Sequence, residues 1–392
     1  MQNKGEGMTK EVSVAVIDIG SGKISGFVAS QLEGDDFNVV AQAEVACSTF
    51  YQGRWIDESD VMHAISSIIS QLADRSGSKP SKIYVGIPGE FSAVATKKAE
   101  IIWQTPKKIM RENLNELFDS IEAFNNANYS AISRSSIYFE LDDQKRVNDP
   151  IGEVASKLSG LISFIFCDNS FKRVVTKAVN ENGITEVDFV PQNLAQALYL
   201  IQPSIRDEYA VLVDCGYVTT SVSVVLGDGI LYSKSFSIGG AQMVDDLSQV
   251  LDIDYPTAEN LMSRVHLNLD FADEEVVTAD GKRLSLSMSN EIGRCRVEDI
   301  AEHIIECING CPHKLPEKLK VFVTGGAFAY LKGGYNTLAR CLNMAIYPAQ
   351  INLPQYDKQE YTSAYGLIGI ALSQCKPVKK GFFKKLLSGF GG

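Results

Sequence analysis

The chain lacks any apolar run long enough to cross a bilayer. A transmembrane helix needs about 20 consecutive apolar residues, and no segment of the 392 residues approaches that length. The first eight residues contain no apolar core of the kind that a secretory signal peptide has. Eight scattered cysteines, several of them in apolar runs, are typical of reduced and buried thiols. We therefore expect a cytoplasmic protein without a membrane-spanning helix.

Positive charge is scarce outside the C-terminal segment. The net charge is −11, and residues 376–392 hold five lysines and no acidic residue, which leaves −16 for the rest of the chain. A body this acidic repels the phosphate backbone of nucleic acids, so we exclude nucleic acid as a partner. An apolar content of 45% and a charged content of 22% are typical of a soluble globular protein.

Two short apolar strands each end in an Asp-x-Gly turn, and a second strand follows each turn. In the first copy Asp18 and Gly20 close the strand, and in the second copy Asp214 and Gly216 do so. The aspartates lie 196 residues apart, which predicts a distant duplication of one unit. Turns rich in glycine present N–H groups to an anion, and an aspartate can hold a hydrated cation. Either turn alone also fits an ordinary hairpin, but the pair predicts a clamp for a magnesium-bound nucleotide.

A third motif follows the same logic near the C-terminal end. Residues 319–324 form a buried strand pattern that runs into Gly325 and Gly326 and then into a helix pattern. Because glycine has no Cβ, such a turn lets a flat ring approach the backbone.

With these three motifs in this order, the chain resembles the actin/Hsp70/sugar-kinase superfamily, and within it the FtsA family of bacterial cell-division proteins. The resemblance implies an α/β fold, the actin-like ATPase fold. It would comprise two duplicated βββαβα halves, a small inserted α+β module and a C-terminal amphipathic helix. The expected parts are a first half (8–89 and 168–205), an inserted module (90–167), a second half (206–246 and 319–374), its subsidiary domain (247–318), and a linker with the amphipathic helix (375–392). Tyr138 and the segment Asp149-Pro150-Ile151-Gly152 match a segment of the FtsA insertion.

The resemblance also assigns binding residues, all named here by their positions in this chain. Asp18 and Asp214 would hold Mg²⁺ through water. The residues assigned to ATP are Gly20, Ser21, Gly22 and Lys23 of the first turn, Gly216 and Thr219 of the second turn, Gly239 and Gly240 at a helix start, Glu259 at the ribose, and Gly325 and Gly326 at the adenine. Each residue type offers what a phosphate or a ribose requires.

The chain departs from the family pattern at several of these positions. Tyr217 and Val218 stand where relatives have two glycines, and both side chains would crowd a phosphate. A β-branched valine also disfavours a positive φ. Ser221, Val190 and Met262 replace an aspartate, a glutamate and a lysine. We therefore assign no catalytic residue, and we expect at most weak ATP hydrolysis with weakened or altered nucleotide binding.

The last residues predict a short amphipathic helix. At 100° per residue its bulky apolar side chains span an arc of about 140°; they are Phe382, Phe383, Leu386, Leu387 and Phe390. Lys384 and Lys385 lie on the opposite side. This pattern favours binding to an anionic membrane surface. A helix packed on the protein's own core and a disordered basic tail are the alternatives.

One cluster of metal-ligating residue types requires a separate interpretation. His303, Cys307 and Cys311 are spaced to share a helix face, with His313 nearby, which would allow a metal site. No paired Cys-x-x-Cys motif accompanies them, and the segment has the apolar pattern of an amphipathic helix. Structural use of these thiols is the favoured interpretation.

Secondary structure in the two less regular regions is predicted from apolar spacing. In the inserted module we expect a strand over 91–103, a helix from about 107, and strands over 136–141 and 160–166. In the subsidiary domain we expect a strand pair over 270–290 around Asp280 and Gly281.

Taken with the resemblance, these patterns describe an actin-like cell-division protein at the cytoplasmic face of the membrane. It would form filaments with itself, bind the C-terminal peptide of FtsZ through residues 247–318, and contact other division proteins at the division site. Two alternatives remain. A small-molecule kinase of the same fold is disfavoured because residues 190 and 221 are not carboxylates. A scaffold like the pilus-assembly protein PilM is disfavoured by the basic amphipathic tail.

Overall fold

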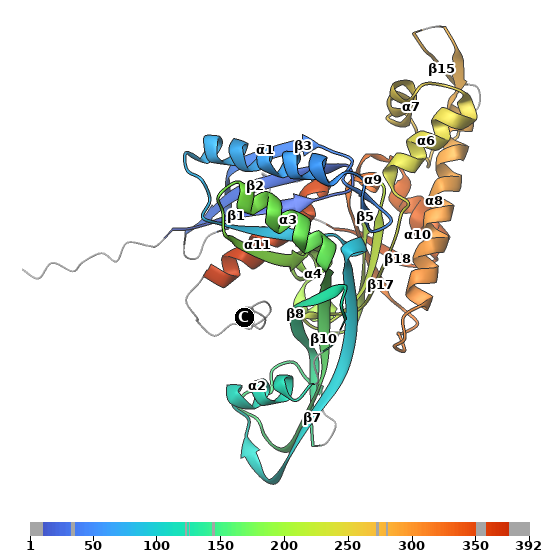
Figure 1. Cartoon of the computed structure of the whole chain (residues 1–392). Helices are drawn as coiled ribbons and strands as arrows, with labels where there is room; N and C mark the ends of the chain where they lie inside the picture. Colours follow the sequence, from blue (N-terminus) through green and yellow to red (C-terminus); the bar gives the residue numbers. More distant parts are fainter. Residues whose placement is uncertain are drawn as a thin grey trace, which may run out of the picture.

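The computed structural model describes residues 11–32, 36–121, 124, 126–142, 146–271, 274–279, 281–349 and 358–375. Asp280 and the predicted amphipathic helix of residues 376–392 lie outside the described residues. Figure 1 shows α1 and α3 on one side of a sheet and α11 on the other, with β7 and β10 extending away from this body.

The first sheet has five strands in the order β11-β6-β1-β2-β3. Its strands are β1 (Val12–Ile19), β2 (Lys23–Gln31), β3 (Asn38–Ala46), β6 (Lys82–Ile87) and β11 (Glu186–Pro191). The central strand β1 is buried on both faces because alternate side chains point to opposite sides. Ile17 packs in the core that α1 and α3 cover, whereas Val16 packs in the core that α11 covers. The carboxyl end of β1, and with it Asp18, is therefore fixed from both sides.

The second sheet repeats this topology with the order β14-β13-β12-β17-β18. Its strands are β12 (Ala210–Cys215), β13 (Thr220–Leu226), β14 (Gly229–Phe236), β17 (Lys320–Thr324) and β18 (Ala345–Pro348). In both sheets the first three strands are antiparallel, and two parallel strands follow on the other side. The predicted duplication is confirmed. Each half also carries a fifth strand beyond the βββαβα pattern, and β18 escaped prediction because it is only four residues long and mostly exposed.

Helices and short elements connect and cover the two sheets. In the first half they are β4 (Phe50–Tyr51), β5 (Arg54–Trp55), α1 (Glu58–Ser76), η1 (Gly89–Phe91), α3 (Asn169–Glu181), α4 (Gln192–Leu200) and α5 (Pro203–Arg206). In the second half they are α6 (Gly240–Leu251), α7 (Tyr255–Met262), α8 (Leu286–Asn309), α9 (Gly326–Tyr330), α10 (Gly334–Leu342), η2 (Gln359–Tyr361) and α11 (Thr362–Cys375). α4 contacts α11 as well as β11 of the first sheet and β12 of the second sheet, so it lies where the two halves meet.

A separate four-stranded antiparallel sheet is formed between β6 and α3. Its strand order is β7-β10-β8-β9, with β7 (Ser92–Lys108), β8 (Tyr129–Leu141), β9 (Arg146–Val147) and β10 (Val154–Asp168). Helix α2 (Arg111–Asp119) packs Leu117 against Phe139 and Leu158 of the sheet. The helix begins later than predicted because Lys107 and Lys108 still pair with β10. The three predicted strands exist as β7, β8 and β10, and each is longer than predicted.

The segment between α6 and α8 contains a small hairpin of β15 (Glu275–Val277) and β16 (Arg283–Ser285). The strand pair predicted over 270–290 is therefore shorter than expected. The Ser285 hydroxyl accepts a hydrogen bond from the Met288 N–H at 3.2 Å and starts α8 at Leu286. Helix α8 ends at Asn309, so Cys311 does not share a helix face with Cys307, contrary to the prediction.

Candidate functional site

A cavity of about 690 Å³ is lined by residues from both halves. All but one of the residues that the resemblance assigns to a nucleotide line it: Asp18, Gly20, Ser21, Gly22, Lys23, Asp214, Gly216, Thr219, Gly240, Glu259, Gly325 and Gly326. Gly239 is the exception. It packs behind the second turn, where an added Cβ would lie 2.5 Å from the Gly216 carbonyl oxygen.

The two glycine turns have the same backbone geometry. The Gly20 N–H donates to the Lys23 carbonyl oxygen at 2.9 Å, and the Gly216 N–H donates to the Thr219 carbonyl oxygen at 2.8 Å. Asp18 pairs with Ser25 across its hairpin, and Asp214 pairs with Ser221. Every one of these positions in the second turn lies 196 residues after its counterpart in the first, so the duplication extends into the turns.

The two aspartates are half-buried and receive hydrogen bonds from one helix. Gln192 of α4 donates to Asp18 Oδ1 at 2.7 Å, and Gln196, one turn later, donates to Asp214 Oδ2 at 2.9 Å. Ser363 of α11 also donates to Asp18 Oδ1 at 2.7 Å. Burial raises the pKa of Asp18 to about 6, and the charge of Asp214 adds to this rise. Burial likewise raises the pKa of Asp214. Two carboxylates that repel each other favour a proton or a cation at this place.

Lys23 and Thr219 occupy equivalent positions, and each contacts acidic side chains. Lys23 Nζ lies 2.9 Å from Glu44 Oε2 and 3.1 Å from Glu360 Oε2. Partial burial opposes the charge of Lys23, but these two hydrogen-bonded carboxylates outweigh it and raise the pKa of its ammonium group. The Thr219 hydroxyl donates to Glu90 Oε1 at 3.1 Å. Each turn thus has its polar side chain bound by protein carboxylates.

Tyr217 and Val218 of the second turn contact the first turn directly. The Val218 N–H donates to Ser21 Oγ at 3.1 Å, and a Cβ added to Gly22 would lie 2.5 Å from Cδ1 of Tyr217. The Tyr217 hydroxyl lies 2.9 Å from that of Tyr255 on α7. We call these contacts of Tyr217 and Val218 with Ser21 and Gly22 the inter-turn contact. The strain expected at Val218 does not arise, because neither Val218 nor Tyr217 has a positive φ.

The far wall of the cavity is formed by the Gly-Gly turn and α7. Gly325 has a φ of 93°, and a Cβ there would lie 2.2 Å from the Cys215 carbonyl oxygen, so this position requires glycine. Gly326 is open, since the nearest atom to its Cβ position, Cβ of Glu360, is 3.8 Å away. Glu259 and Met262 of α7 line the same cavity.

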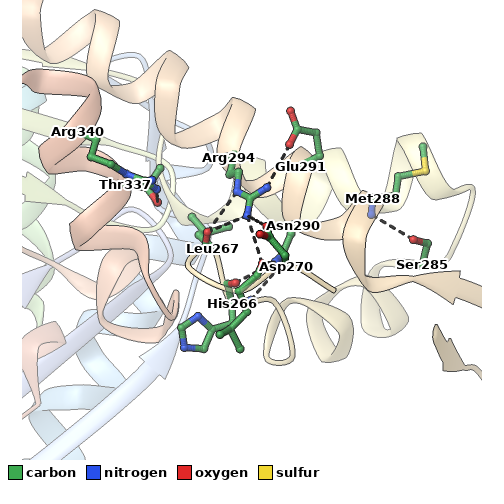
Figure 2. A network of polar contacts seen from close by, with 11 residues as sticks. His266, Leu267, Asp270, Ser285, Met288, Asn290, Glu291, Arg294, Thr337 and Arg340 are labelled. Carbon is green, nitrogen blue, oxygen red and sulfur yellow. Dashed lines mark hydrogen bonds and ion pairs between the residues drawn. The ribbon is translucent and has the colours of Figure 1, made fainter. Parts of the chain in front are cut away.

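A polar network on α8 contacts the segment that follows α7 (Figure 2). The Arg294 guanidinium donates to the Leu267 carbonyl oxygen through Nε and Nη2, at 3.2 and 3.1 Å. Asn290 exchanges two hydrogen bonds of 2.9 Å with the backbone of His266. The Leu267 N–H in turn donates to the carbonyl oxygen of Lys332, which lines the cavity. The network therefore connects α8 to the cavity wall.

Several lining residues were not predicted from sequence. Gln192, Gln196 and Ser363 hold the two aspartates, and Glu360 binds Lys23. Spacing offers one signal after the fact, since residues four apart on a helix share a face, as Gln192 and Gln196 do. Ser363 and Glu360 come from the other end of the chain, and nothing local in their sequence indicates this site.

The substituted positions provide no carboxylate to the cavity. Val190 is fully buried in β11, and the Ser221 hydroxyl pairs with the Ser235 hydroxyl at 2.8 Å. Acidic side chains nevertheless outnumber basic ones among the lining residues, with Asp18, Asp214, Glu259 and Glu360 against Lys23 and Lys332. An anionic ligand therefore meets an acidic cavity unless a cation accompanies it.

The side chains of the predicted thiol cluster and the apolar length of the helices can be checked in the described residues. Within the described ranges no group of three or more His, Cys, Asp or Glu side chains is arranged to hold a metal ion. The His303 ring packs against the Phe236 ring in a tilted arrangement, with 5.1 Å between their centroids, and Cys307 is buried in the core beneath α8. None of the helices described is both long and apolar enough to span a membrane.

Comparison with known sequences finds distant relatives. No protein-family model matches the chain. The cell division protein FtsA of Buchnera aphidicola is 20% identical over 272 residues, which cover 68% of this chain and 64% of that protein, slightly less than two thirds of its length. The cell division protein FtsA of Streptococcus pneumoniae is 21% identical over 350 residues, which cover 89% of this chain and 74% of that protein. The chain is thus distantly similar to FtsA proteins along most of its length.

Comparison with solved structures establishes the fold. The PilM–PilN type IV pilus biogenesis complex contains a chain that matches with a TM-score of 0.60 at 14% identity, covering 93% of this chain and 99% of that one. MreB5 of Spiroplasma citri bound to ADP matches with a TM-score of 0.54 at 11% identity, covering 92% and 96%. The chain therefore has the actin-like α/β fold that the sequence predicts.

Proposed function

We propose that the chain is an actin-like protein of bacterial cell division that self-assembles and tethers FtsZ filaments to the cytoplasmic face of the membrane. The observation that carries this proposal is the similarity to FtsA over 89% of the chain. In this proposal residues 90–167 are an inserted domain and residues 247–318 are a subsidiary domain that binds the C-terminal peptide of FtsZ. Residues 377–392 bind the anionic membrane, with other division proteins as further partners at the division site.

The cavity is proposed to bind an adenine nucleotide weakly or in an altered way. Its volume, the open backbone at Gly326 and the carboxylate of Glu259 suit a ring and a ribose. ADP is bound by the MreB5 structure that shares this fold. The inter-turn contact occupies space where the phosphates of a nucleotide would lie, which weakens their binding. No side chain of the cavity is assigned to hydrolysis, so ATPase activity is at most weak.

Mg²⁺ is proposed to accompany the nucleotide at Asp18 and Asp214. The two carboxylates are close enough for the charge of one to raise the pKa of the other, and oxygen ligands of this kind suit a hydrated Mg²⁺ ion. A bound cation would relieve this repulsion and reduce the negative charge of the cavity.

The membrane and partner parts of the proposal are tested by co-sedimentation. Full-length protein is mixed with vesicles that contain anionic phospholipid, with and without FtsZ, and compared with a variant that lacks residues 377–392. We expect the full chain to carry FtsZ into the vesicle pellet, and the shortened chain to bind FtsZ in solution but to leave it in the supernatant. Equal behaviour of the two chains contradicts the membrane assignment.

The FtsZ contact is tested with exposed apolar side chains of the proposed subsidiary domain. Val277 of β15 and Met288 of α8 are 62% and 48% exposed. Each is changed to lysine, and binding of the FtsZ C-terminal peptide is measured by fluorescence anisotropy. Ile102 of β7, which is 67% exposed, provides the matched control outside this region. Loss of binding in Ile102→Lys but in neither of the other two variants contradicts the assignment to residues 247–318.

A second candidate is a scaffold of a pilus machine, and the match to the PilM–PilN complex favours it. Both candidates share the fold, so partners distinguish them. Capture of a PilN-like peptide in preference to the FtsZ C-terminal peptide, measured by the same anisotropy titration, would support the scaffold.

A further inference from the structure

The inter-turn contact closes the place where an anion would touch both glycine turns at once. Val218 N–H donates to Ser21 Oγ at 3.1 Å, so the two turns are one hydrogen bond apart. The Tyr217 ring lies over Gly22, within 2.5 Å of where a Cβ would be. A phosphate held by both turns needs room between them. That room is taken by protein atoms in this arrangement.

The polar groups that could bind such a phosphate also have protein partners. The N–H groups of Gly20 and Gly216 donate to carbonyl oxygens within their own turns. The Thr219 hydroxyl donates to Glu90, and Lys23 is bound between Glu44 and Glu360. A phosphate chain would have to replace these bonds and would face the acidic side chains of the cavity.

A different ligand chemistry is indicated by an unpaired acceptor. Gln196 is 1% exposed and lines the cavity, and its Oε1 has no hydrogen-bond partner, while its Nε2 is bound to Asp214. A buried carbonyl oxygen without a partner is destabilising, and only a donor relieves this. A ribose hydroxyl or an adenine amino group supplies one, so this acceptor favours a ligand with a nucleoside part, and the turns decide how many phosphates it can carry.

We propose that Tyr217 determines ligand specificity in the cleft, which takes a nucleoside or a nucleoside monophosphate in preference to a di- or triphosphate. The ring occupies the space between the two turns, whose residues line part of the 690 Å³ cavity, and the rest of the cavity accepts a base and a sugar with hydroxyl groups. This assignment rests on the nucleotide binding proposed above.

The test measures affinities as a function of phosphate number. Adenosine, AMP, ADP and ATP, each with Mg²⁺, are titrated calorimetrically into the full-length protein. We expect adenosine and AMP to bind at least tenfold more tightly than ATP. Tyr217→Ala should reduce this preference at least tenfold by admitting the phosphates, whereas Tyr217→Phe, which keeps the ring, should retain it.

Tyr347→Ala is the matched control, because Tyr347 of β18 is 43% exposed and does not line the cavity. It should leave the preference unchanged. Equal affinities for AMP and ATP in the unaltered protein, or an unchanged preference in Tyr217→Ala, overturn the assignment to Tyr217 and leave nucleotide binding standing. If no ligand binds either protein, both this assignment and the nucleotide part of the proposed function are wrong.

Hydrogen exchange provides a readout that needs no ligand. The Val218 amide is protected by its bond to Ser21, so Tyr217→Ala should speed its exchange at least tenfold relative to Tyr347→Ala. Unchanged exchange means that the ring does not hold the turns together, and the proposal fails.

Discussion

The two halves of the molecule share a backbone plan and differ in what their turns carry. Both sheets have the same strand order, and both turns close with the same N–H···O bond from the glycine. The first turn holds Ser21 and Gly22, which are small, while the second holds Tyr217 and Val218, which fill the space opposite. Apolar strands therefore specify the shared fold, and a few turn side chains decide what fits between the halves.

The halves also differ in the hydrogen bonds that the glutamines of α4 donate to their aspartates. Gln192 makes two bonds, to Asp18 and to the Ile19 carbonyl oxygen, whereas Gln196 bonds Asp214 and leaves its own carbonyl oxygen unpaired. The first half thus has two bonds from its glutamine at this point, and the second half retains a buried acceptor without a partner.

The largest difference is expected at the turns that follow the parallel strands β6 and β17. Gly325→Ala places a Cβ 2.2 Å from a backbone oxygen at a φ of 93°, whereas Gly89→Ala meets the hydroxyl ends of Ser221 and Ser235, which can rotate. Left-handed strain and backbone overlap together cost about 3 kcal/mol or more, and loss of the serine pair costs about 1 kcal/mol. Urea unfolding measures both variants, and equal losses would show that the two turns are interchangeable.

The aspartates provide the next comparison through pH. The folded pKa of Asp18 is about 6, above the unfolded value of about 3.9. The folded state therefore binds more protons between pH 4 and 6, and the free energy of unfolding falls as pH rises through this window. The rise in the pKa of Asp18 from about 3.9 to about 6 corresponds to about 3 kcal/mol.

Asp18→Asn removes this contribution. Between pH 4 and 7 the free energy of unfolding should fall in both proteins, and the fall in Asp18→Asn should be smaller by about 3 kcal/mol. Asp214→Asn should act in the same direction, because the pKa of Asp214 is also raised by burial. Parallel stability curves for the unaltered protein and Asp18→Asn contradict the burial of a charged Asp18.

The comparison also shows what could be predicted from sequence. The duplicated hairpins and the glycine turns were visible as short patterns, because strand burial and turn chemistry are local. Ser363 of α11 and Glu360 of η2 were not predicted, since this later part of the chain reaches the site only by folding back onto the first half. From sequence, Tyr217 and Val218 were expected only to crowd a phosphate. Their contact with the first turn was not predicted, because the sequence of one turn does not indicate the position of the other.

A smaller difference in stability between the halves is expected for the two glutamines of α4. Gln192→Leu removes two bonds and leaves the Ile19 carbonyl oxygen unpaired, which should cost about 2 kcal/mol. Gln196→Leu removes one bond and also removes an unpaired oxygen, so it should cost about 1 kcal/mol. Urea unfolding at neutral pH compares them. A larger loss for Gln196→Leu would mean that the unpaired oxygen has a partner in solution, such as an ordered water.

The smallest effects on stability are expected at the equivalent positions 23 and 219. Their dependence on salt concentration should differ. Lys23→Gln removes a partly exposed ion pair with Glu44 and Glu360, which is worth less than about 1 kcal/mol. Thr219→Val removes the bond to Glu90, with a similar cost. Because salt screens the ion pair, the loss in Lys23→Gln should shrink between 0.05 and 0.5 M salt, roughly a threefold change in Debye length. The loss in Thr219→Val should stay constant, since no full positive charge is removed. If both losses respond alike to salt, then the two carboxylate contacts are equivalent despite their different side chains, and the halves differ less in electrostatics than in the bulk of their turns.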